Sequence, residues 1–369
     1  MPNAQTSTSY VQTVLGRMSP GDLGPTMMHE HIFVDITSII EELPGAAARA
    51  RQHEPIRLDN LGWVRQNYMS HYSNLLLADI AIAVAELRDF KEWGGGTIVD
   101  VTPIGIGRDP QALARASRSA GVHIVMSTGY YVEATHPPEV KHMTEAALTT
   151  TMIRELQEGV VESRGGVHDD CNPEHRDTGV KAGIIKIGCS WPLSTSERKV
   201  LCAAVRAQAE TGAAITVHTG RDEKSPLEII AALDKAGADL TRVVMGHLDL
   251  RVQTVDVLRR IADSGCYLEW DLFGLETSYY PFTNADMPSD GQRIDVVNEL
   301  IADGHRDRCL ISHDIAHNHR LRHFGGHGYK HILETVVPFM RKKGVSQEDI
   351  DAILVANPAR VLSIGENRA

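Results

Sequence analysis

Aromatic residues, cysteines and long apolar runs are scarce in this chain of 369 residues. No apolar run approaches the ~20 residues of a membrane-spanning helix, and the polar stretch 1–17 lacks the apolar core of a signal peptide. The five cysteines are scattered without a CxxC pair, and their odd number disfavours a disulfide framework. Reduced thiols are typical of the cytoplasm. We therefore expect a cytoplasmic protein with no membrane partner.

Basic residues are also few relative to acidic ones. Lys and Arg number 37 against 48 Asp and Glu, which gives a formal net charge of -11. Such a surface repels a phosphate backbone, so the composition argues against nucleic acid and favours a small-molecule substrate. Histidine is abundant by contrast, with 18 residues, eight of which stand in His29-Glu30-His31 and between His313 and His331. Because histidine is the commonest metal ligand and titrates near neutral pH, these clusters indicate a metal or catalytic site.

Short apolar or β-branched runs, most of which end in a polar residue, alternate along the chain with amphipathic segments. The runs predict eight strands, at residues 26–35, 97–101, 123–130, 182–187, 214–218, 242–247, 266–271 and 308–314. Helical spacing of apolar residues predicts helices at residues 78–93, 194–211, 226–236, 252–264 and 292–303. Alternating strands and helices favour parallel β-α units, and eight such units close into a barrel.

The rival architecture is an open, doubly wound sheet, which would need a glycine-rich turn after the first strand. The first strand of this chain ends instead in His29-Glu30-His31. We therefore predict an α/β fold of the (β/α)8 TIM-barrel type, as a single domain over residues 1–369 with the barrel at about 20–362. Residues 41–73 and 131–178 are expected to form long loops after strands one and three, on the face where barrels bind substrates.

Polar side chains stand at or near the carboxyl ends of five predicted strands: His29, His31, Lys186, His218, His247 and Asp314. Residues two apart on a strand face the same side, so His29 and His31 can chelate one ion. Four histidines and a carboxylate suit Zn²⁺, Mn²⁺ or Co²⁺. Lys186 is unusual, because an apolar strand buries an ammonium group only at a large desolvation cost.

The sequence around these residues resembles the metal signature of the phosphotriesterase family in the amidohydrolase superfamily. The motifs, in order, are Gly24-Pro25-Thr26 before His29-Glu30-His31, Ala182 to Lys186, Val217-His218-Thr219, Gly246-His247-Leu248-Asp249, Ser312-His313-Asp314 and Asn357-Pro358-Ala359-Arg360. Three more motifs are similar to the phosphotriesterase-related, N-acetyltaurine hydrolase-like branch: Gly188 to Leu193, Tyr267 to Gly274 and Phe324 to Tyr329.

The resemblance implies a binuclear centre with two divalent ions, zinc being the first choice and manganese or cobalt the alternatives. One ion would be held by His29, His31 and Asp314, and a more exposed ion by His218 and His247. Lys186, carboxylated by CO₂ to N6-carboxylysine, would bridge both ions together with a hydroxide. Carboxylation explains the buried lysine, because it replaces a cation with an anion that the metals stabilise. The branch usually has Glu at this position, whereas this chain has Lys186. A homodimer is the family expectation.

These residues predict a metal-dependent hydrolase in which the bridging hydroxide attacks an amide, ester or lactone carbonyl. Asp314 is the expected catalytic residue, taking a proton as general base and returning it to the leaving group. Two alternatives stay open: a phosphotriester hydrolase of the organophosphate-degrading type, and a catalytically silent binding protein of the same fold. Full retention of the six strand-end side chains disfavours the second.

Three residues are the candidates for substrate contacts. Tyr131 follows strand three, where its hydroxyl could bond a substrate carbonyl oxygen, and a packing role is about equally probable. Arg221 lies three residues past His218 and could pair with a carboxylate or sulfonate. Arg320 stands on the loop after Asp314, where substrate contacts are expected. A solvated loop charge is the alternative for both arginines.

Overall fold

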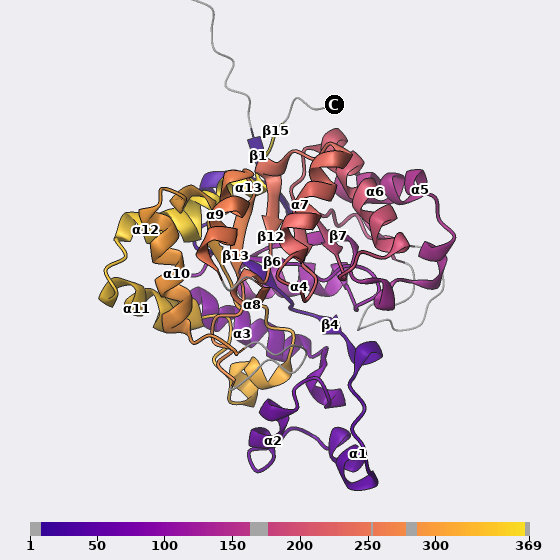
Figure 1. The fold of residues 1–369 in the computed structure, drawn as a ribbon. Helices are drawn as coiled ribbons and strands as arrows, with labels where there is room; N and C mark the ends of the chain where they lie inside the picture. Colours follow the sequence, from indigo (N-terminus) through magenta and orange to yellow (C-terminus); the bar gives the residue numbers. More distant parts are fainter. Residues whose placement is uncertain (1–8, 163–175, 252–253, 278–285, 366–369) are drawn as a thin grey trace, which may run out of the picture.

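The computed structural model describes residues 9–162, 176–251, 254–277 and 286–365. Within these ranges eight parallel strands form one sheet, in which each strand pairs with the next barrel strand along the chain (Figure 1). The strands are β3 (Thr26–Glu30), β6 (Thr97–Asp100), β7 (His123–Tyr130), β10 (Ile184–Gly188), β11 (Ile215–His218), β12 (Val243–Met245), β13 (Tyr267–Trp270) and β14 (Cys309–Ile311). They coincide with the eight predicted strands, and the predicted α/β barrel is confirmed.

Helices cover the outside of this barrel. Those that follow the first seven strands are α3 (Ile80–Glu92), α4 (Pro110–Ala120), α5 (Glu145–Gln157), α6 (Thr195–Thr211), α7 (Ser225–Ala236), α9 (Val255–Asp263) and α10 (Asp290–Ala302). Local sequence sets their ends: Ser194 and Glu197 form a capping box at the start of α6, and Ser289 and Gln292 form another at α10. Shorter helices are α8 (Leu248–Arg251), α11 (Val337–Lys342), α12 (Gln347–Asp351) and α13 (Asn357–Leu362).

Side-chain hydrogen bonds join the first barrel strand to the last. The sheet order ends at β3 on one side and at β14 on the other. Across this seam the buried Glu30 carboxylate accepts hydrogen bonds from the Ser312 hydroxyl at 2.8 Å and the His313 amide at 2.9 Å. The Asp314 amide donates to the His29 carbonyl oxygen at 3.0 Å. The seam thus places the first predicted ligand motif against the last one.

The end of the barrel opposite the strand carboxyl ends is filled by apolar side chains. The cluster inside this end includes Met28, Val99, Val125, Ile184, Tyr267 and Leu310. A small sheet of β1 (Ser9–Thr13), β2 (Gly16–Met18) and β15 (Ile364–Gly365) lies at this end, where Figure 1 labels β1 and β15. Substrate access is therefore left to the other end.

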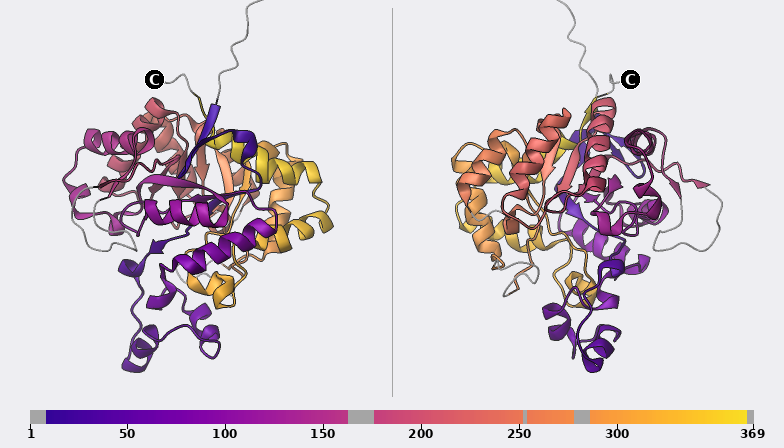
Figure 2. Two further views of the ribbon diagram at one scale, coloured as in Figure 1. Left: turned by 180° about the vertical axis from the view of Figure 1, so that it is seen from behind. Right: turned by 45° about the vertical axis from the view of Figure 1, so that its right-hand side comes forward.

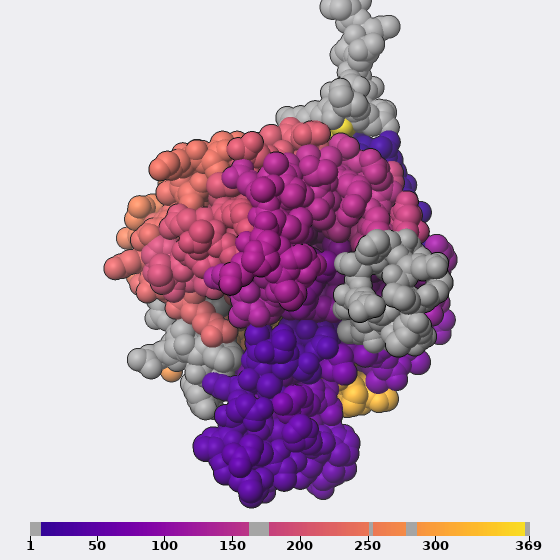
Figure 3. Space-filling view, turned by 90° about the vertical axis from the view of Figure 1, so that its right-hand side faces the viewer, coloured from indigo at the N-terminus to yellow at the C-terminus, as the bar shows by residue number. Residues whose placement is uncertain are grey.

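The segment after β3 leaves the barrel and forms a lobe. It contains β4 (Val34–Asp35), α1 (Ala46–Gln52), α2 (Leu61–Gln66) and β5 (Leu76–Leu77). Figures 1 and 2 show this lobe projecting from the barrel on the side away from the termini, and Figure 3 shows it as a distinct protrusion. The predicted insertion at residues 41–73 accordingly lies beside the mouth.

The segment at residues 131–178 is only partly a loop. It contains α5, which packs against α6, and the short strands β8 (Val161–Glu162) and β9 (Arg176–Asp177). Residues 163–175, Cys171 among them, lie outside the described part of the chain. The four described cysteines are free, as expected: Cys189, Cys202, Cys266 and Cys309. None of the described helices combines the length and apolar character needed to cross a membrane.

Candidate metal centre

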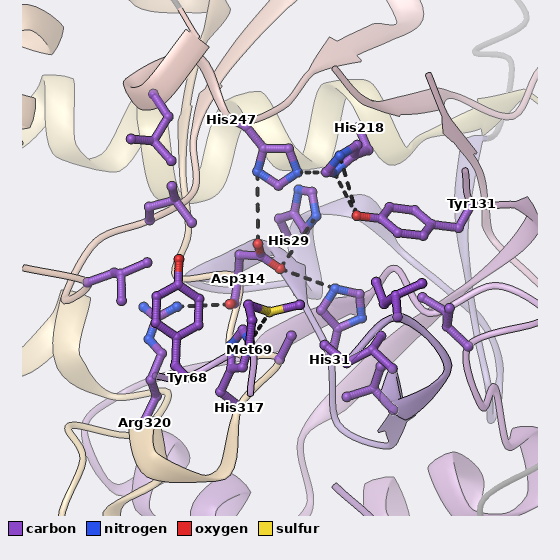
Figure 4. A pocket seen from close by; sticks show the side chains of 18 of the residues that line it. His29, His31, Tyr68, Met69, Tyr131, His218, His247, Asp314, His317 and Arg320 are labelled. Atoms are coloured by element: carbon purple, nitrogen blue, oxygen red, sulfur yellow. Dashed lines mark hydrogen bonds and ion pairs between the residues drawn. The ribbon is translucent and has the colours of Figure 1, made fainter. Parts of the chain in front are cut away.

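The six predicted strand-end side chains meet in one pocket at the mouth of the barrel. Its lining includes all of them: His29, His31, Lys186, His218, His247 and Asp314. Figure 4 labels the four histidines and Asp314. They come from five strands or from the turns directly after them, as parallel strands in a barrel require. The convergence expected from the sequence is therefore present in the structure.

His29, His31 and Asp314 form the tightest group of these residues. The Nε2 atom of His31 lies 3.1 Å from Asp314 Oδ1, and the Nε2 atom of His29 lies 3.8 Å from the same oxygen. One candidate ligand atom from each residue lies within 4.8 Å of the other two. Although burial opposes the charged form, the hydrogen bond with His31 and the neighbouring imidazoles hold the pKa of Asp314 well below its usual range. The carboxylate is thus ionised and positioned among nitrogen donors.

His218 and His247 form the second group, at or just after the ends of the adjacent strands β11 and β12. His218 Nδ1 lies 2.6 Å from His247 Nε2, so two imidazole nitrogens face each other at the mouth. The Tyr131 hydroxyl lies 3.2 Å from His218 Nδ1. His218 is half-buried while His247 is buried, so this group stands nearer to solvent than His29 does.

Lys186 is buried between the two groups. Its exposed fraction is 1%, and its Nζ atom lies 3.0 Å from His29 Nε2. Burial lowers the pKa of Lys186 to about 8, against the opposing influence of Asp314 and Asp271. A neutral amine is the form that reacts with CO₂, so the environment of this lysine suits the predicted carboxylation. Gly129 lets the neighbouring strand come close, because a Cβ there would lie 2.1 Å from the Lys186 carbonyl oxygen.

Asp271 supports both groups at once, a role that the sequence interpretation missed. Its Oδ1 atom accepts from His247 Nδ1 at 2.8 Å, and its Oδ2 atom lies 2.9 Å from both His29 Nδ1 and the His247 amide nitrogen. Gly246 makes room for it, since a Cβ there would lie 2.9 Å from Asp271 Oδ2. Thr102 plays the corresponding part for His31, with its hydroxyl 2.7 Å from Nδ1. The signal for Asp271 was its position at the end of the seventh predicted strand.

The orientation of the imidazoles tests whether these residues suit a metal. A carboxylate can only accept hydrogen bonds, so Asp271 holds a proton on Nδ1 of both His29 and His247 and directs each Nε2 into the pocket. Burial and the Lys186 charge oppose it, but Asp271 raises the pKa of His29 to about 10, so a metal would displace a proton from this imidazole. Buried imidazole nitrogens that face a carboxylate, the Lys186 amine or another imidazole match divalent cations that take nitrogen and oxygen ligands. The site therefore fits a His/Asp metal centre, with His29, His31 and Asp314 as one set of close donors and His29, His247 and Asp271 as another, and it is consistent with a binuclear centre.

Two of these residues have a left-handed backbone that non-glycine residues seldom adopt. The φ angles are +59° at His247 and +51° at Asp314. Such a conformation costs about 1–2 kcal/mol per residue, so surrounding contacts have to hold it. Asp271 does so at the His247 amide, and Arg320 donates to the Asp314 carbonyl oxygen at 2.9 Å.

The three predicted substrate residues all line the pocket, but they differ in burial and in their contacts. Tyr131 lies beside His218, and Arg221 is exposed. Arg320 is 3% exposed, and besides Asp314 it donates to the Phe273 carbonyl oxygen at 2.9 Å. Arg320 thus ties the loop after β14 to the loop after β13. Of the two arginines, Arg221 is the exposed one.

The rest of the pocket is largely apolar. It encloses about 840 Å³ of space, part of it open to solvent at the mouth. The apolar lining residues are Val34, Ile36, Ile39, Met69, Ile106, Leu250, Leu272, Leu275 and Ala316. Asp314 is the single acidic residue among the described lining residues. The pocket therefore combines a polar floor with apolar walls.

Comparison with known proteins gives one family over nearly the whole chain. The model of the phosphotriesterase family matches residues 9–362. The phosphotriesterase-related protein of Nematostella vectensis is 43% identical over 357 residues, which cover 95% of this chain and 98% of that protein. The N-acetyltaurine hydrolase of Homo sapiens is 42% identical over 356 residues, which cover 96% of this chain and 97% of that enzyme.

A solved structure agrees with these sequence comparisons. The crystal structure of a resiniferatoxin-binding protein from Rhodobacter sphaeroides is similar with a TM-score of 0.88 and 30% identity. The match covers 96% of this chain and 94% of that one. The barrel and its mouth therefore belong to a known type of fold.

Proposed function

Because the chain belongs to the phosphotriesterase family and is a metal-dependent hydrolase, we propose that it hydrolyses a small amide at a binuclear centre. The first candidate is the amide of an N-acyl aminosulfonate, with an ester or a lactone as the next choice. The observation that carries the proposal is the meeting of His29, His31, Lys186, His218, His247 and Asp314 in one pocket. Several relatives about 40% identical over nearly their full length are N-acetyltaurine hydrolases, which favours the amide.

Under the proposal His29, His31 and Asp314 would hold one divalent ion, His218 and His247 would hold a second, and Lys186 would contribute to both as N6-carboxylysine. When bound, such ions would lower the pKa of a water toward neutrality and polarise the substrate carbonyl. Zinc is the proposed metal, with manganese or cobalt as alternatives.

The remaining chemistry falls to side chains of the chain itself. Asp314 takes the proton of the attacking water on its carboxylate and delivers it to the departing amide nitrogen, so that the carbonyl carbon gains oxygen and the amine leaves protonated. Its low pKa keeps it ionised before the attack. The Tyr131 hydroxyl is placed beside His218 to bond the substrate carbonyl oxygen. Arg221 pairs with the sulfonate or carboxylate of the substrate.

A direct test is to reconstitute the purified protein with Zn²⁺ or Mn²⁺ and bicarbonate, measure the bound metal, and follow amine release from N-acyl aminosulfonates. The panel should include lactones, carboxyl esters and phosphotriesters. Release of amine with about two metals per chain supports the proposal. Turnover of phosphotriesters alone would favour the organophosphate-degrading alternative.

A binding protein without turnover is the second candidate, and the similarity to a resiniferatoxin-binding protein favours it. Absence of both bound metal and turnover after reconstitution would support this reading. Intact mass under CO₂ tests the carboxylation of Lys186 separately. A single domain, a homodimer and a cytoplasmic location stay predictions. Limited proteolysis would test the first, and analytical ultracentrifugation would test the second.

A further inference from the structure

The apolar part of the pocket is not explained by a short acyl group. An acetyl group presents a single methyl, whereas four aliphatic side chains of the segment after β3 line the pocket: Val34, Ile36, Ile39 and Met69. An apolar wall of this kind stabilises a ligand in proportion to the hydrocarbon area that it removes from water. The wall therefore matches a longer hydrocarbon chain.

This wall is held in place before any ligand binds. The Met69 sulfur lies 3.2 Å from His317 Nε2, and the Tyr68 ring lies edge-on to the His317 ring with 5.1 Å between centroids. These contacts fasten the base of the lobe to the loop after β14, and Figure 4 shows Tyr68, Met69 and His317 together. A preformed wall spares the ordering of side chains that binding would otherwise require.

The strand order puts the wall opposite the candidate anion site. Counted around the barrel, β3 is the first strand and β11 is the fifth of the eight in the described sheet. In a nearly closed barrel of eight strands these two face each other across the mouth. Arg221 follows β11, and the wall follows β3, so the six strand-end side chains lie between the cation and the hydrocarbon surface.

From this arrangement, and resting on the proposed amide hydrolysis, we infer that the substrate is an N-acyl aminosulfonate or N-acyl amino acid with an acyl chain longer than acetyl. Its anionic head binds Arg221, its amide lies over the six strand-end side chains, and its acyl chain runs along the wall of Val34, Ile36, Ile39 and Met69. No acidic side chain other than Asp314 lines the described pocket to repel the anion.

The test is a chain-length series on the metal-loaded protein. The taurine amides of acetic, butyric, hexanoic and octanoic acids are compared with the ethanolamine amides of the same acids, which lack the anion. Each buried methylene contributes about a factor of 4 in binding. We expect kcat/KM to rise by about that factor per methylene in both series until the wall is filled, mainly through KM.

Two neighbouring residues provide a matched pair of variants. Ile39 and Ile40 are both half-buried, and of the two only Ile39 lines the described pocket. Ile39→Ala should reduce the gain per methylene, whereas Ile40→Ala should preserve both the gain and the activity on the acetyl substrate. Arg221→Gln should lower kcat/KM for all taurine amides by one common factor and spare the ethanolamine amides, because the two ends bind independently.

The inference is overturned if the acetyl substrate is the best of the series, or if Ile39→Ala and Ile40→Ala behave alike. Calorimetric titration of the metal-loaded protein with the same amides separates this result from a failure of the proposed function. If no amide is hydrolysed, the proposed activity is wrong, and Kd still decides the inference. A Kd that falls with chain length supports the wall as an acyl site, and a Kd independent of chain length refutes it.

Discussion

Replacement of Asp271 by Asn should weaken metal binding in an uneven way. The carboxylate accepts from His247 Nδ1 on one oxygen and from His29 Nδ1 and the His247 amide on the other, at 2.8–2.9 Å. An asparagine offers one acceptor in place of two. The orientation that loses least keeps the two contacts of Oδ2 and gives up the hydrogen bond to His247 Nδ1. The neutral amide also loses the negative charge that both imidazoles face.

The expected magnitude follows from these contacts. Loss of an outer partner of a metal-binding histidine typically lowers metal affinity 10–100-fold, or about 1.4–2.8 kcal/mol. We expect the Zn²⁺ site that involves His247 to weaken by this amount in Asp271→Asn. The site of His29 should weaken less, because its hydrogen bond survives. Thr102→Val serves as the control, since Thr102 contacts His31 and neither of the other two histidines.

The measurement is a competitive titration of Zn²⁺ against a fluorescent chelator, with the metal content checked by mass spectrometry. Asp271→Asn should show one strongly and one mildly weakened site, while Thr102→Val should weaken one site only. If both affinities of Asp271→Asn stay within about threefold of the parent protein, Asp271 does not orient the ligands and the interpretation of its contacts is wrong.

Three other predictions concern two residues of the metal site and one buried ion pair of the fold. Asp314→Asn should lose about 100-fold or more in kcat while keeping most of its metal, and near-normal turnover would exclude its role in proton transfer. Lys186→Glu should take up metal without added bicarbonate, whereas metal uptake by the parent protein should depend on bicarbonate; equal uptake with and without it would contradict carboxylation. Arg108→Met should lower the free energy of unfolding at pH 7 by about 3–5 kcal/mol, because it leaves the buried Glu155 carboxylate without the two hydrogen bonds that Arg108 donates at 2.7 and 2.9 Å. Burial alone would raise the pKa of Glu155, but the Arg108 charge outweighs it and lowers the pKa. The contribution of this pair is therefore present above the unfolded carboxyl pKa of about 4.3 and fades as the pH falls through the folded value. Urea unfolding at pH 7 and in acid should show the difference between variant and parent shrinking, and a difference independent of pH would contradict the assignment.

The barrel and the meeting of the six side chains were predictable because both depend on repetition. Parallel strands recur eight times, and they bring their carboxyl ends, with the polar residues at or just after them, to one face. His29 and His31 could be placed on one side of a strand by the period of two alone. Such regularities survive in a single sequence because they do not depend on which distant residue is the partner.

The partners of the ligands were not predictable for the opposite reason. Asp271 and Thr102 each acquire their role from a histidine on another strand, and nothing next to them in the chain marks that contact. Arg320 carried the expectation of a substrate contact because it follows Asp314, yet its guanidinium is buried against two backbone carbonyl oxygens. The side chains of the wall are ordinary aliphatic residues in sequence, and only the path of the lobe brings them to the pocket.

The seam held by Glu30 has a consequence for how the protein is made. His29 and Ser312, which meet across the seam, are 283 residues apart in the chain. A ribosome-bound chain that has not yet released Asp314 lacks both the closing contacts and the carboxylate of the tightest ligand group. A nascent chain therefore cannot complete that ligand group, or close the barrel seam, until synthesis is nearly finished.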